Sequence, residues 1–439
     1  MMQHLRPLLG GVVRSAALVV RSAALLVTLV GLSFRADGAT SMGVHVHELK
    51  PFRALGSSFS GIRLWDTRTT WKDLEVEQGQ WDFRRLDGFV EAALRSGRKV
   101  LLTLGSTPAW ASMRPEERCG YGSGCAAPPR KLIDWREYVR QVVMRYRGRI
   151  ECYEIWNEVR FREEDPYDYG GPTDFYSGTS DELVELTREA FEVIKDIDPL
   201  ACVLSPSFHV RADWIGNLDR FLSKGGKDFI DGVSFHFYSL TPEHSLRSLR
   251  AVRAVMDKHG IGDKPLWNTE FGYKFNELVS EEADIAAIRR MASLVSRSVI
   301  LASSEKVARH YWYAFDNRNY GVYYAYIHRP ALFESADRSA PLSDFLQLVD
   351  EINELLRTFS FSDCRPHRSP VWMCYLTDRR NGTSGVTVWS SEPDFKEGCI
   401  GKESLPESVR QVVDSRGKVL KMIPPEGICV GSSPMLLTE

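Results

Sequence analysis

The segment Tyr153-Glu154-Ile155-Trp156-Asn157-Glu158 ends a short apolar run that begins at Cys152 and is typical of a β-strand. The segment Leu266-Trp267-Asn268-Thr269-Glu270-Phe271-Gly272 repeats the pattern, with Trp and Asn shortly before a glutamate. Both segments belong to a longer alternation of short strand patterns and longer helical patterns. That alternation decides the predicted fold.

Eight strand patterns alternate with helical patterns between residues 40 and 357. The expected strands are Met42–His45, Gly61–Trp65, Lys99–Leu104, Cys152–Trp156, Cys202–Ser205, Gly232–Phe237, Pro265–Thr269 and Ala308–Tyr313. The clearest helical patterns are Phe83–Ser96, Trp135–Tyr146, Asp181–Asp196, Ser245–His259, Glu281–Ser303 and Pro341–Arg357. Eight strand–helix units predict an α/β fold, a (β/α)₈ TIM barrel.

The period of the apolar pattern changes to two in residues 358–439. Expected strands there are Val371–Thr377, Gly385–Ser390, Val409–Asp414 and Gly427–Gly431, separated by turn sequences such as Asn381-Gly382. The sequence therefore predicts a small all-β, sandwich-like domain after the barrel.

The two strand-end glutamates are the candidate catalytic residues. In a barrel of this type the active site lies at the carboxyl ends of the strands, and strands four and seven face each other across its mouth. Glu158 and Glu270 would then share one cleft. Two such carboxyl groups are what cleavage of a glycosidic bond requires, one to protonate the leaving oxygen and one to attack or stabilise the anomeric carbon.

The motifs resemble those of clan A of the retaining glycoside hydrolases, and within it family 39, which includes xylosidases, iduronidases and bacterial exopolysaccharide glycosidases. The resemblance rests on Trp156-Asn157-Glu158, on Asn268-Thr269-Glu270-Phe271-Gly272, on Gly61-Ile62-Arg63-Leu64-Trp65 and on Ser234-Phe235-His236-Phe237-Tyr238. It implies a retaining O-glycosidase acting on a poly- or oligosaccharide such as a bacterial exopolysaccharide. The all-β tail resembles the accessory β-sandwich that often follows such barrels.

The resemblance also implies roles for individual residues. Glu158 matches the acid/base and Glu270 the nucleophile. Asn157 matches the residue that hydrogen-bonds the sugar 2-hydroxyl. His236 and Tyr238 match positions beside the nucleophile, where one of them would orient it or touch the sugar.

Further side chains are expected at the same mouth. Arg63, at the end of strand two, would keep Glu270 ionised through its charge and hydrogen bonds. Three indoles could stack on a sugar ring, and they are Trp312, Trp110 and Trp65. His45 shares one strand face with His47; without an evident third metal ligand, we expect His45 to hydrogen-bond within the mouth or to sugar.

Composition excludes several other functions. The formal net charge of -2, with 26% charged residues and no basic stripe, gives no sign of nucleic-acid binding. No metal site or cofactor is expected, because paired carboxyl groups need neither. The loop Arg160–Gly178 is rich in Asp, Glu and Tyr, which is typical of a solvated loop or of a wall of the substrate groove.

Residues 1–39 predict a secretory signal peptide or an N-terminal anchor, which would be the only membrane tether. Arginines precede an uncharged run, Ser22–Phe34, that is short for a membrane span of about 20 residues. A secreted or periplasmic location predicts disulfides among the eight cysteines. We expect the pairs Cys119–Cys125, Cys364–Cys374 and Cys399–Cys429, with Cys152 and Cys202 as neighbouring thiols.

Two other functions fit parts of the sequence. A non-catalytic carbohydrate-binding protein could use the same barrel, although the intact Asn157, Glu158 and Glu270 argue against a decayed site. A metal-dependent barrel hydrolase could use His45-Val46-His47 as metal ligands. Turnover of glycosides would distinguish a glycosidase from the carbohydrate-binding protein. Loss of activity on chelation would indicate the metal-dependent hydrolase.

Overall fold

The computed structural model describes residues 40–161, 175–209, 215–274, 284–324, 340–392 and 398–439. The chain divides into two units, Met1–Gly38 and the compact unit Ala39–Glu439. The expected signal or anchor segment lies outside the described residues, as do the acidic residues of the loop after strand four.

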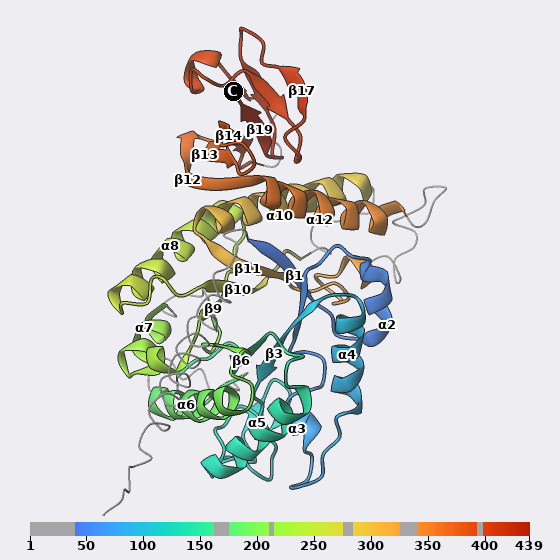
Figure 1. Cartoon of the computed structure of the whole chain (residues 1–439), viewed down its shortest axis with the longest axis vertical. Coiled ribbons are helices and arrows are strands. Elements are labelled where there is room, and N and C mark those ends of the chain that lie inside the picture. Colours follow the sequence, from blue (N-terminus) through green and yellow to red (C-terminus); the bar gives the residue numbers. More distant parts are fainter. Residues whose placement is uncertain (1–39, 162–174, 210–214, 275–283, 325–339, 393–397) are drawn as a thin grey trace, which may run out of the picture. The chain divides into compact units, whose positions relative to one another are not determined.

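A curled sheet of nine parallel strands forms the centre of the compact unit (Figure 1). Its spatial order is β7-β6-β3-β2-β1-β11-β10-β9-β8, and a parallel bridge between Leu204 and Gly232 joins its two ends. The strands are β1 (Ser41–His45), β2 (Gly61–Leu64), β3 (Lys99–Leu104), β6 (Cys152–Ile155), β7 (Cys202–Leu204), β8 (Phe208–His209), β9 (Val233–His236), β10 (Leu266–Phe271) and β11 (Val307–Trp312).

The predicted barrel fold is confirmed, and each of the eight expected strands is present within a few residues of its expected bounds. Strand five differs, because it is divided into β7 and β8. Pro206 lies between the two pieces and has no N–H for the ladder, so pairing resumes only at Phe208. The strands are buried almost throughout, as expected for a parallel sheet covered by helices.

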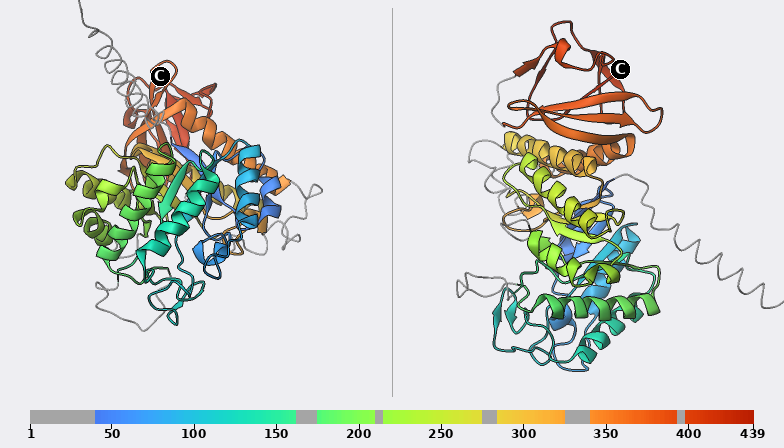
Figure 2. Two further views of the ribbon diagram at one scale, coloured as in Figure 1. Left: turned by 60° about the horizontal axis from the view of Figure 1, so that its bottom comes forward. Right: turned by 90° about the vertical axis from the view of Figure 1, so that its left-hand side faces the viewer.

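Helices surround the strands on the outside (Figures 1 and 2). They are α2 (Leu49–Phe52), α3 (Trp71–Leu74), α4 (Arg84–Arg95), α5 (Leu132–Tyr146), α6 (Ser180–Ile197), α7 (Ile215–Ser223), α8 (Pro242–Lys258), α10 (Asp284–Ser304) and α12 (Ala340–Thr358). The N-cap of α6 is Thr179, which forms a capping box with Glu182.

An antiparallel sheet of six strands follows α12 directly and is accompanied by a short two-stranded pair. The six-stranded sheet has the order β12-β13-β14-β19-β16-β17. The strands are β12 (Phe359–Arg368), β13 (Val371–Asp378), β14 (Ser384–Ser390), β15 (Gly398–Ile400), β16 (Gln411–Val413), β17 (Val419–Met422), β18 (Ile428–Val430) and β19 (Met435–Thr438). The all-β tail is thus confirmed, although β12, β15, β17 and β19 were not predicted.

The C-terminal sheet packs on the barrel helices α10 and α12 (Figures 1 and 2). One apolar core continues from the barrel into Phe359, Phe361 and Trp389. The Trp389 indole donates to Glu243 Oε1 at 2.7 Å, and Arg297 donates to the carbonyl of Ser390 at 2.8 Å. The apolar core therefore continues across the predicted domain boundary between residues 357 and 358. The division into two domains at that point stays a prediction.

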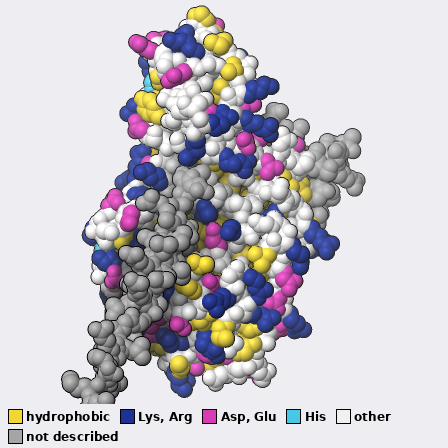
Figure 3. Space-filling view, in the orientation of Figure 1, with side chains coloured by type: hydrophobic (Ala, Val, Ile, Leu, Met, Phe, Trp, Pro, Cys, Tyr) yellow, Lys and Arg dark blue, Asp and Glu magenta, His cyan; other side chains and the backbone are white. Residues whose placement is uncertain are grey.

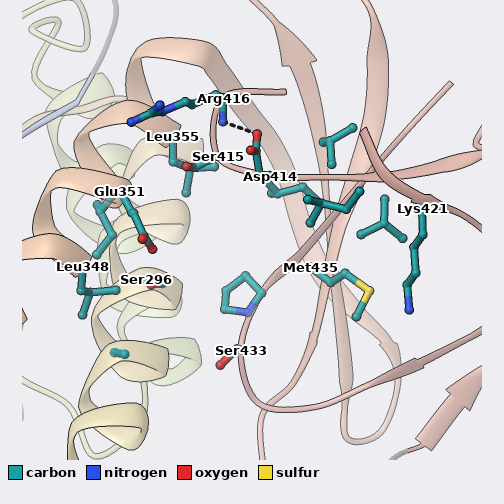
Figure 4. A pocket seen from close by; sticks show the side chains of 17 residues that line it. Ser296, Leu348, Glu351, Leu355, Asp414, Ser415, Arg416, Lys421, Ser433 and Met435 are labelled. Atoms are coloured by element: carbon teal, nitrogen blue, oxygen red, sulfur yellow. Dashed lines mark hydrogen bonds between the residues drawn. The ribbon is translucent and has the colours of Figure 1, made fainter. Parts of the chain in front are cut away.

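A cavity of about 750 Å³ lies between these helices and the C-terminal sheet (Figure 4). Aliphatic side chains such as Leu348 and Leu355 line one wall, and the turn at Asp414 and Arg416 lines another. None of the described residues that line the cavity is aromatic. The cavity therefore offers no ring for stacking on a sugar.

All eight cysteines are paired in four disulfides, as is typical of extracellular or periplasmic proteins. The three predicted pairs, Cys119–Cys125, Cys364–Cys374 and Cys399–Cys429, are confirmed. The prediction of thiols at Cys152 and Cys202 is wrong. These residues face each other in register on β6 and β7, with Cα atoms 4.4 Å apart, so their sulfurs form the fourth disulfide.

On the face shown in Figure 3, basic and acidic side chains are mixed over the described residues. Within the same residues, no helix combines the length and the apolar character needed to cross a bilayer.

Candidate active site

Glu158 and Glu270 lie together at the carboxyl ends of β6 and β10. Glu270 is within β10, and Glu158 follows β6 by three residues. One oxygen from each carboxyl group and one ring nitrogen of His236 all lie within 4.8 Å of one another. Both side chains remain accessible, with 17% of Glu158 and 10% of Glu270 exposed. The tertiary structure thus brings together the two carboxyl groups that the sequence singled out.

The chain turns sharply where it presents Glu158. Trp156 and Glu158 have positive φ angles, of 69° and 42°, which non-glycine residues rarely adopt. The turn is fixed by hydrogen bonds, because the N–H of Trp156 donates to Leu104 O and the N–H of Glu158 donates to Ser207 Oγ. Such conformations occur in folded proteins where a functional side chain must be held in one position.

His236 lies between the two carboxyl groups. Its Nδ1 is 2.9 Å from Glu158 Oε1 and 3.8 Å from Glu270 Oε2. Burial, followed by the charge of Arg63, holds the pKa of His236 well below its ordinary value, so the ring is neutral. A neutral ring whose Nδ1 carries the proton can donate to Glu158. The prediction left open which strand-six residue touches the nucleophile, and His236 contacts mainly Glu158.

Tyr238 is the strand-six residue that binds the candidate nucleophile. Its hydroxyl donates to Glu270 Oε1 at 2.6 Å. The ring of His209 stacks on Tyr238 with centroids 5.6 Å apart, and His209 Nε2 is 3.9 Å from Glu158 Oε1. His209 was not predicted, because it lies on β8, the piece of strand five that the sequence pattern did not reveal.

Arg63 joins Glu270 to a second carboxylate inside the barrel. Its Nη1 donates to Glu270 Oε2 at 3.0 Å, and its Nη2 and Nε donate to Glu154 Oε2 at 2.6 and 2.8 Å. Arg63 and Glu154 are both fully buried. The predicted contact of Arg63 with Glu270 is present, but Glu154, four residues before Glu158, was missed as its second partner.

Glu154 is ionised within the barrel. Burial alone would raise its pKa, but the Arg63 charge, helped by His236 and by hydroxyl donors, holds the pKa of Glu154 below its ordinary value. The hydroxyl donors are Thr103 and Ser234. The alternation of β6 could have revealed this residue, because Glu154 is the inward-facing position between Tyr153 and Ile155, which face the helices.

The two candidate catalytic carboxyl groups titrate together. Burial, and after it the charge of Glu158, raises the pKa of Glu270 well above its ordinary value, whereas Arg63 and Tyr238 act in the opposite direction. Two carboxyl groups this close hold one proton between them at intermediate pH. Arg63 and Tyr238 both donate to Glu270 and so favour its negative charge.

Asn157 and His45 complete the layer beneath the carboxyl groups. Asn157 Oδ1 accepts from Arg63 Nη2 at 2.5 Å and from Ser207 at 3.4 Å, which leaves its Nδ2 to donate to a ligand. His45 Nε2 lies 2.9 Å from the carbonyl of Thr269. Burial, followed by the Arg63 charge, holds the pKa of His45 well below its ordinary value, so a neutral ring donates there. The expected hydrogen-bonding role of His45 within the mouth matches this contact.

The three candidate indoles have different positions. Trp312 is fully buried, with its ring 5.5 Å from Phe271 and 5.7 Å from Phe345 of α12. The prediction that Trp312 stacks on sugar is therefore wrong, because alternation along β11 turns it toward the helices. Trp65 is 3% exposed and packs edge-on against Tyr121, and Trp110 packs on Trp71. Sugar contact by Trp65 and Trp110 stays a prediction.

The residue after Trp312 occupies the mouth instead. The ring of Tyr313 lies 5.1 Å from His45 and 5.6 Å from Tyr320, which in turn lies 6.0 Å from Tyr238. The Tyr313 hydroxyl donates to Asp66 at 2.8 Å. Trp312 was predicted from its place near the end of strand eight, and Tyr313, the last residue of that expected strand, is the one whose ring lies at the mouth.

One group of described side chains could hold a metal ion, and it consists of Glu158, His236 and Glu270. Among the described residues, neither His45 nor His47 belongs to such a group.

The fold is a TIM barrel followed by a C-terminal β-domain, an arrangement that the chain shares with solved glycoside hydrolases of families 39 and 30. Among solved structures, it is similar to a family 39 glycoside hydrolase from Bacteroides cellulosilyticus, at 18% identity over 92% of this chain and 81% of that one, with a TM-score of 0.62. No protein-family model matches the sequence, and no curated protein matches it.

The chain is also similar to two further solved structures. One is a family 30 endoxylanase from Clostridium papyrosolvens, at 13% identity, covering 91% of this chain and 96% of that one, with a TM-score of 0.55. The other is a family 39 β-xylosidase from Caulobacter crescentus, at 17% identity, covering 78% and 79%, with a TM-score of 0.51. The predicted resemblance to clan A is confirmed at the level of the fold.

Proposed function

We propose that the protein is a retaining glycoside hydrolase that cleaves O-glycosidic bonds of a poly- or oligosaccharide. The observation that carries the proposal is the placement of Glu158 and Glu270, whose nearest oxygens lie within 4.8 Å at the carboxyl ends of facing strands. Retaining enzymes hold their carboxyl groups ~5–5.5 Å apart, whereas inverting enzymes need ~6.5–9.5 Å to admit a water molecule. The observed separation favours direct attack by one carboxylate.

In the first step Glu270 attacks the anomeric carbon and forms a glycosyl ester, while Glu158 gives its proton to the departing oxygen. Arg63 and Tyr238, which both donate to Glu270, hold the attacking carboxylate ionised and in one orientation. Asn157, fixed through its Oδ1, directs Nδ2 toward the sugar 2-hydroxyl.

In the second step water releases the sugar from Glu270. Formation of the ester removes the negative charge of Glu270, so the pKa of Glu158 falls and its carboxylate becomes the base that activates the water. His236 Nδ1, 2.9 Å from Glu158 Oε1, donates to that carboxylate. The oxygen of the water becomes the anomeric hydroxyl of the released sugar, in the configuration of the bond that was cleaved.

The setting of the enzyme is part of the same proposal. The resemblance to family 39 suggests a bacterial exopolysaccharide as the first substrate to test. Residues 1–39 would act as a signal or anchor that directs residues 40–357, the catalytic barrel, and residues 358–439, the β-domain, to the periplasm or the exterior. The four disulfides support a location outside the reducing cytoplasm.

A panel of aryl glycosides and polysaccharides, with sizing of the products, tests the function. Turnover by the wild-type protein and none by Glu270→Ala supports a glycosidase. Saccharide binding without turnover by the wild-type protein would point instead to the carbohydrate-binding alternative. Activity that is lost on chelation and restored by a divalent metal would favour a metal-dependent hydrolase using Glu158, His236 and Glu270.

A further inference from the structure

Asp66 is an acidic residue at the candidate active site that the mechanism does not use. It lies two residues after the end of β2, at the same face of the barrel as Glu158 and Glu270. Its Oδ1 accepts from the Tyr121 hydroxyl and its Oδ2 from the Tyr313 hydroxyl. The side chain keeps 17% of its surface exposed, so a ligand can reach the carboxylate.

The partners of Asp66 connect it to the nucleophile. Tyr313 packs against Tyr320, Tyr320 packs against Tyr238, and the Tyr238 hydroxyl binds Glu270. The charge of Asp66 also helps to raise the pKa of Glu270, after burial and the charge of Glu158, whereas Arg63 lowers it. A sugar ring bound over Glu270 would therefore lie close to Asp66.

The charges around this position favour some sugars over others. Among the described side chains in contact with Glu270, Arg63 is the one permanent cation, and it also neutralises the buried Glu154. His47, 3.7 Å from Asp66, is the one basic side chain that the described residues place beside that carboxylate. A carboxylate or sulfate on a sugar bound against Asp66 and Glu270 would be brought close to groups of like charge, and like charges brought together repel strongly.

We propose that Asp66, held by Tyr121 and Tyr313, is a specificity-determining residue that accepts a hydrogen bond from a sugar hydroxyl and rejects sugars bearing an acidic group. The proposal rests on the proposed glycosidase function. A hydroxyl bound to a carboxylate makes a charge-assisted hydrogen bond, which is stronger than one between neutral groups. The substrate class is thus a polysaccharide whose sugar at the cleaved bond is not a uronate.

Matched pairs of substrates test the proposal. The 4-nitrophenyl α- and β-glucosides and galactosides are compared with the corresponding glucuronides and galacturonides, which differ only at C6. The wild-type protein should turn over neutral members and should be at least ~10-fold less active, by kcat/KM, on their acidic counterparts.

The Asp66→Asn variant keeps the size of the side chain and removes its charge. It should lose ~10-fold in kcat/KM on the preferred neutral substrate, and the ratio of acidic to neutral turnover should rise by a similar factor. Asp196→Asn makes the same charge change at an exposed residue near the end of α6. This control should leave unchanged both kcat/KM on the neutral substrate and the ratio of acidic to neutral turnover. Thermal unfolding of the three proteins shows whether a loss of activity reflects a loss of folded protein.

The possible failures are distinguishable. A wild-type protein that prefers uronides refutes the role of Asp66 while leaving the glycosidase function intact. An acidic-to-neutral ratio that Asp66→Asn does not change, in a folded protein, refutes it as well. Absence of turnover on every glycoside and polysaccharide refutes the proposed function, and the inference with it.

Discussion

The hydroxyl of Tyr238, two residues after the end of the neighbouring strand β9, donates to Oε1 of Glu270 at 2.6 Å. This bond favours the charged form of a carboxyl group whose pKa burial and Glu158 raise. The ionisation of the nucleophile therefore depends on a small number of donors, Tyr238 and Arg63 among them.

Removing the Tyr238 hydroxyl should weaken the nucleophile. In Tyr238→Phe the pKa of Glu270 should rise further, because a donor to its charged form is lost. The low-pH limb of the kcat/KM profile should move to higher pH, and kcat should fall ~10- to 10²-fold. A profile that stays in place while kcat falls would mean that Tyr238 contributes only to packing.

Neutralising Glu154 should have the opposite effect on the pH profile. In Glu154→Gln, Arg63 no longer pairs with a second carboxylate, so its positive charge acts on Glu270 alone. The pKa of Glu270 should then fall, and the low-pH limb of the kcat/KM profile should move to lower pH. The variant should also lose about 3–5 kcal/mol of stability, because a buried charge loses its partner. Denaturant unfolding and pH–rate profiles measure the two effects.

The pH dependence of wild-type stability follows from the same pair. The pKa of Glu154 is lowered in the folded protein, so its contribution to stability is fully present above the unfolded value, about 4.3, and is lost as pH falls through the folded value. The stability difference between the wild-type protein and Glu154→Gln should therefore shrink in acid below pH ~4.

The roles of the two glutamates can be separated with azide. Glu158→Ala should nearly stop cleavage of a natural linkage but should still form the ester from an activated aryl glycoside, since a phenolate leaves without a proton. General acid–base help is worth ~10²–10⁴-fold, so the contrast is measurable. Azide should restore the rate of Glu158→Ala and give a glycosyl azide of retained configuration. Rescue of Glu270→Ala with an inverted azide would show that the roles are exchanged.

The stereochemistry of hydrolysis tests the double displacement directly. Proton NMR in the first minutes of the reaction should show a product with the anomeric configuration of the substrate. An initial product of opposite configuration would indicate that water attacks in place of Glu270, despite carboxyl oxygens within 4.8 Å.

The disulfide between Cys152 and Cys202 should stabilise the barrel beside the active site. It closes a loop with a sequence separation of 50 and joins β6, which leads to Glu158, with β7. Replacing both residues by serine should cost about 2–5 kcal/mol in unfolding free energy. Peptide mapping without reduction should recover the two residues in one linked fragment; free thiols at both positions would contradict the bond.

Much of this protein followed from the sequence alone. Period and spacing identified the eight barrel strands, because a buried parallel strand must be apolar along its whole length. The strand-end position of Glu158 and Glu270 followed from the same pattern, since parallel strands end at one face of the barrel. Arg63 was also correctly expected beside Glu270, because the end of strand two faces the same interior.

Only the tertiary structure decided which partners those residues take. Glu154 binds Arg63, Asp66 binds Tyr313, and Cys152 is bonded to Cys202, across sequence separations of 91, 247 and 50 residues. A sequence pattern gives the face on which a side chain lies, but not its neighbours from distant strands. Trp312 and Tyr313 show the same limit. Successive residues of a strand point to opposite faces, so Tyr313 lies at the barrel mouth while Trp312 packs beneath the helices.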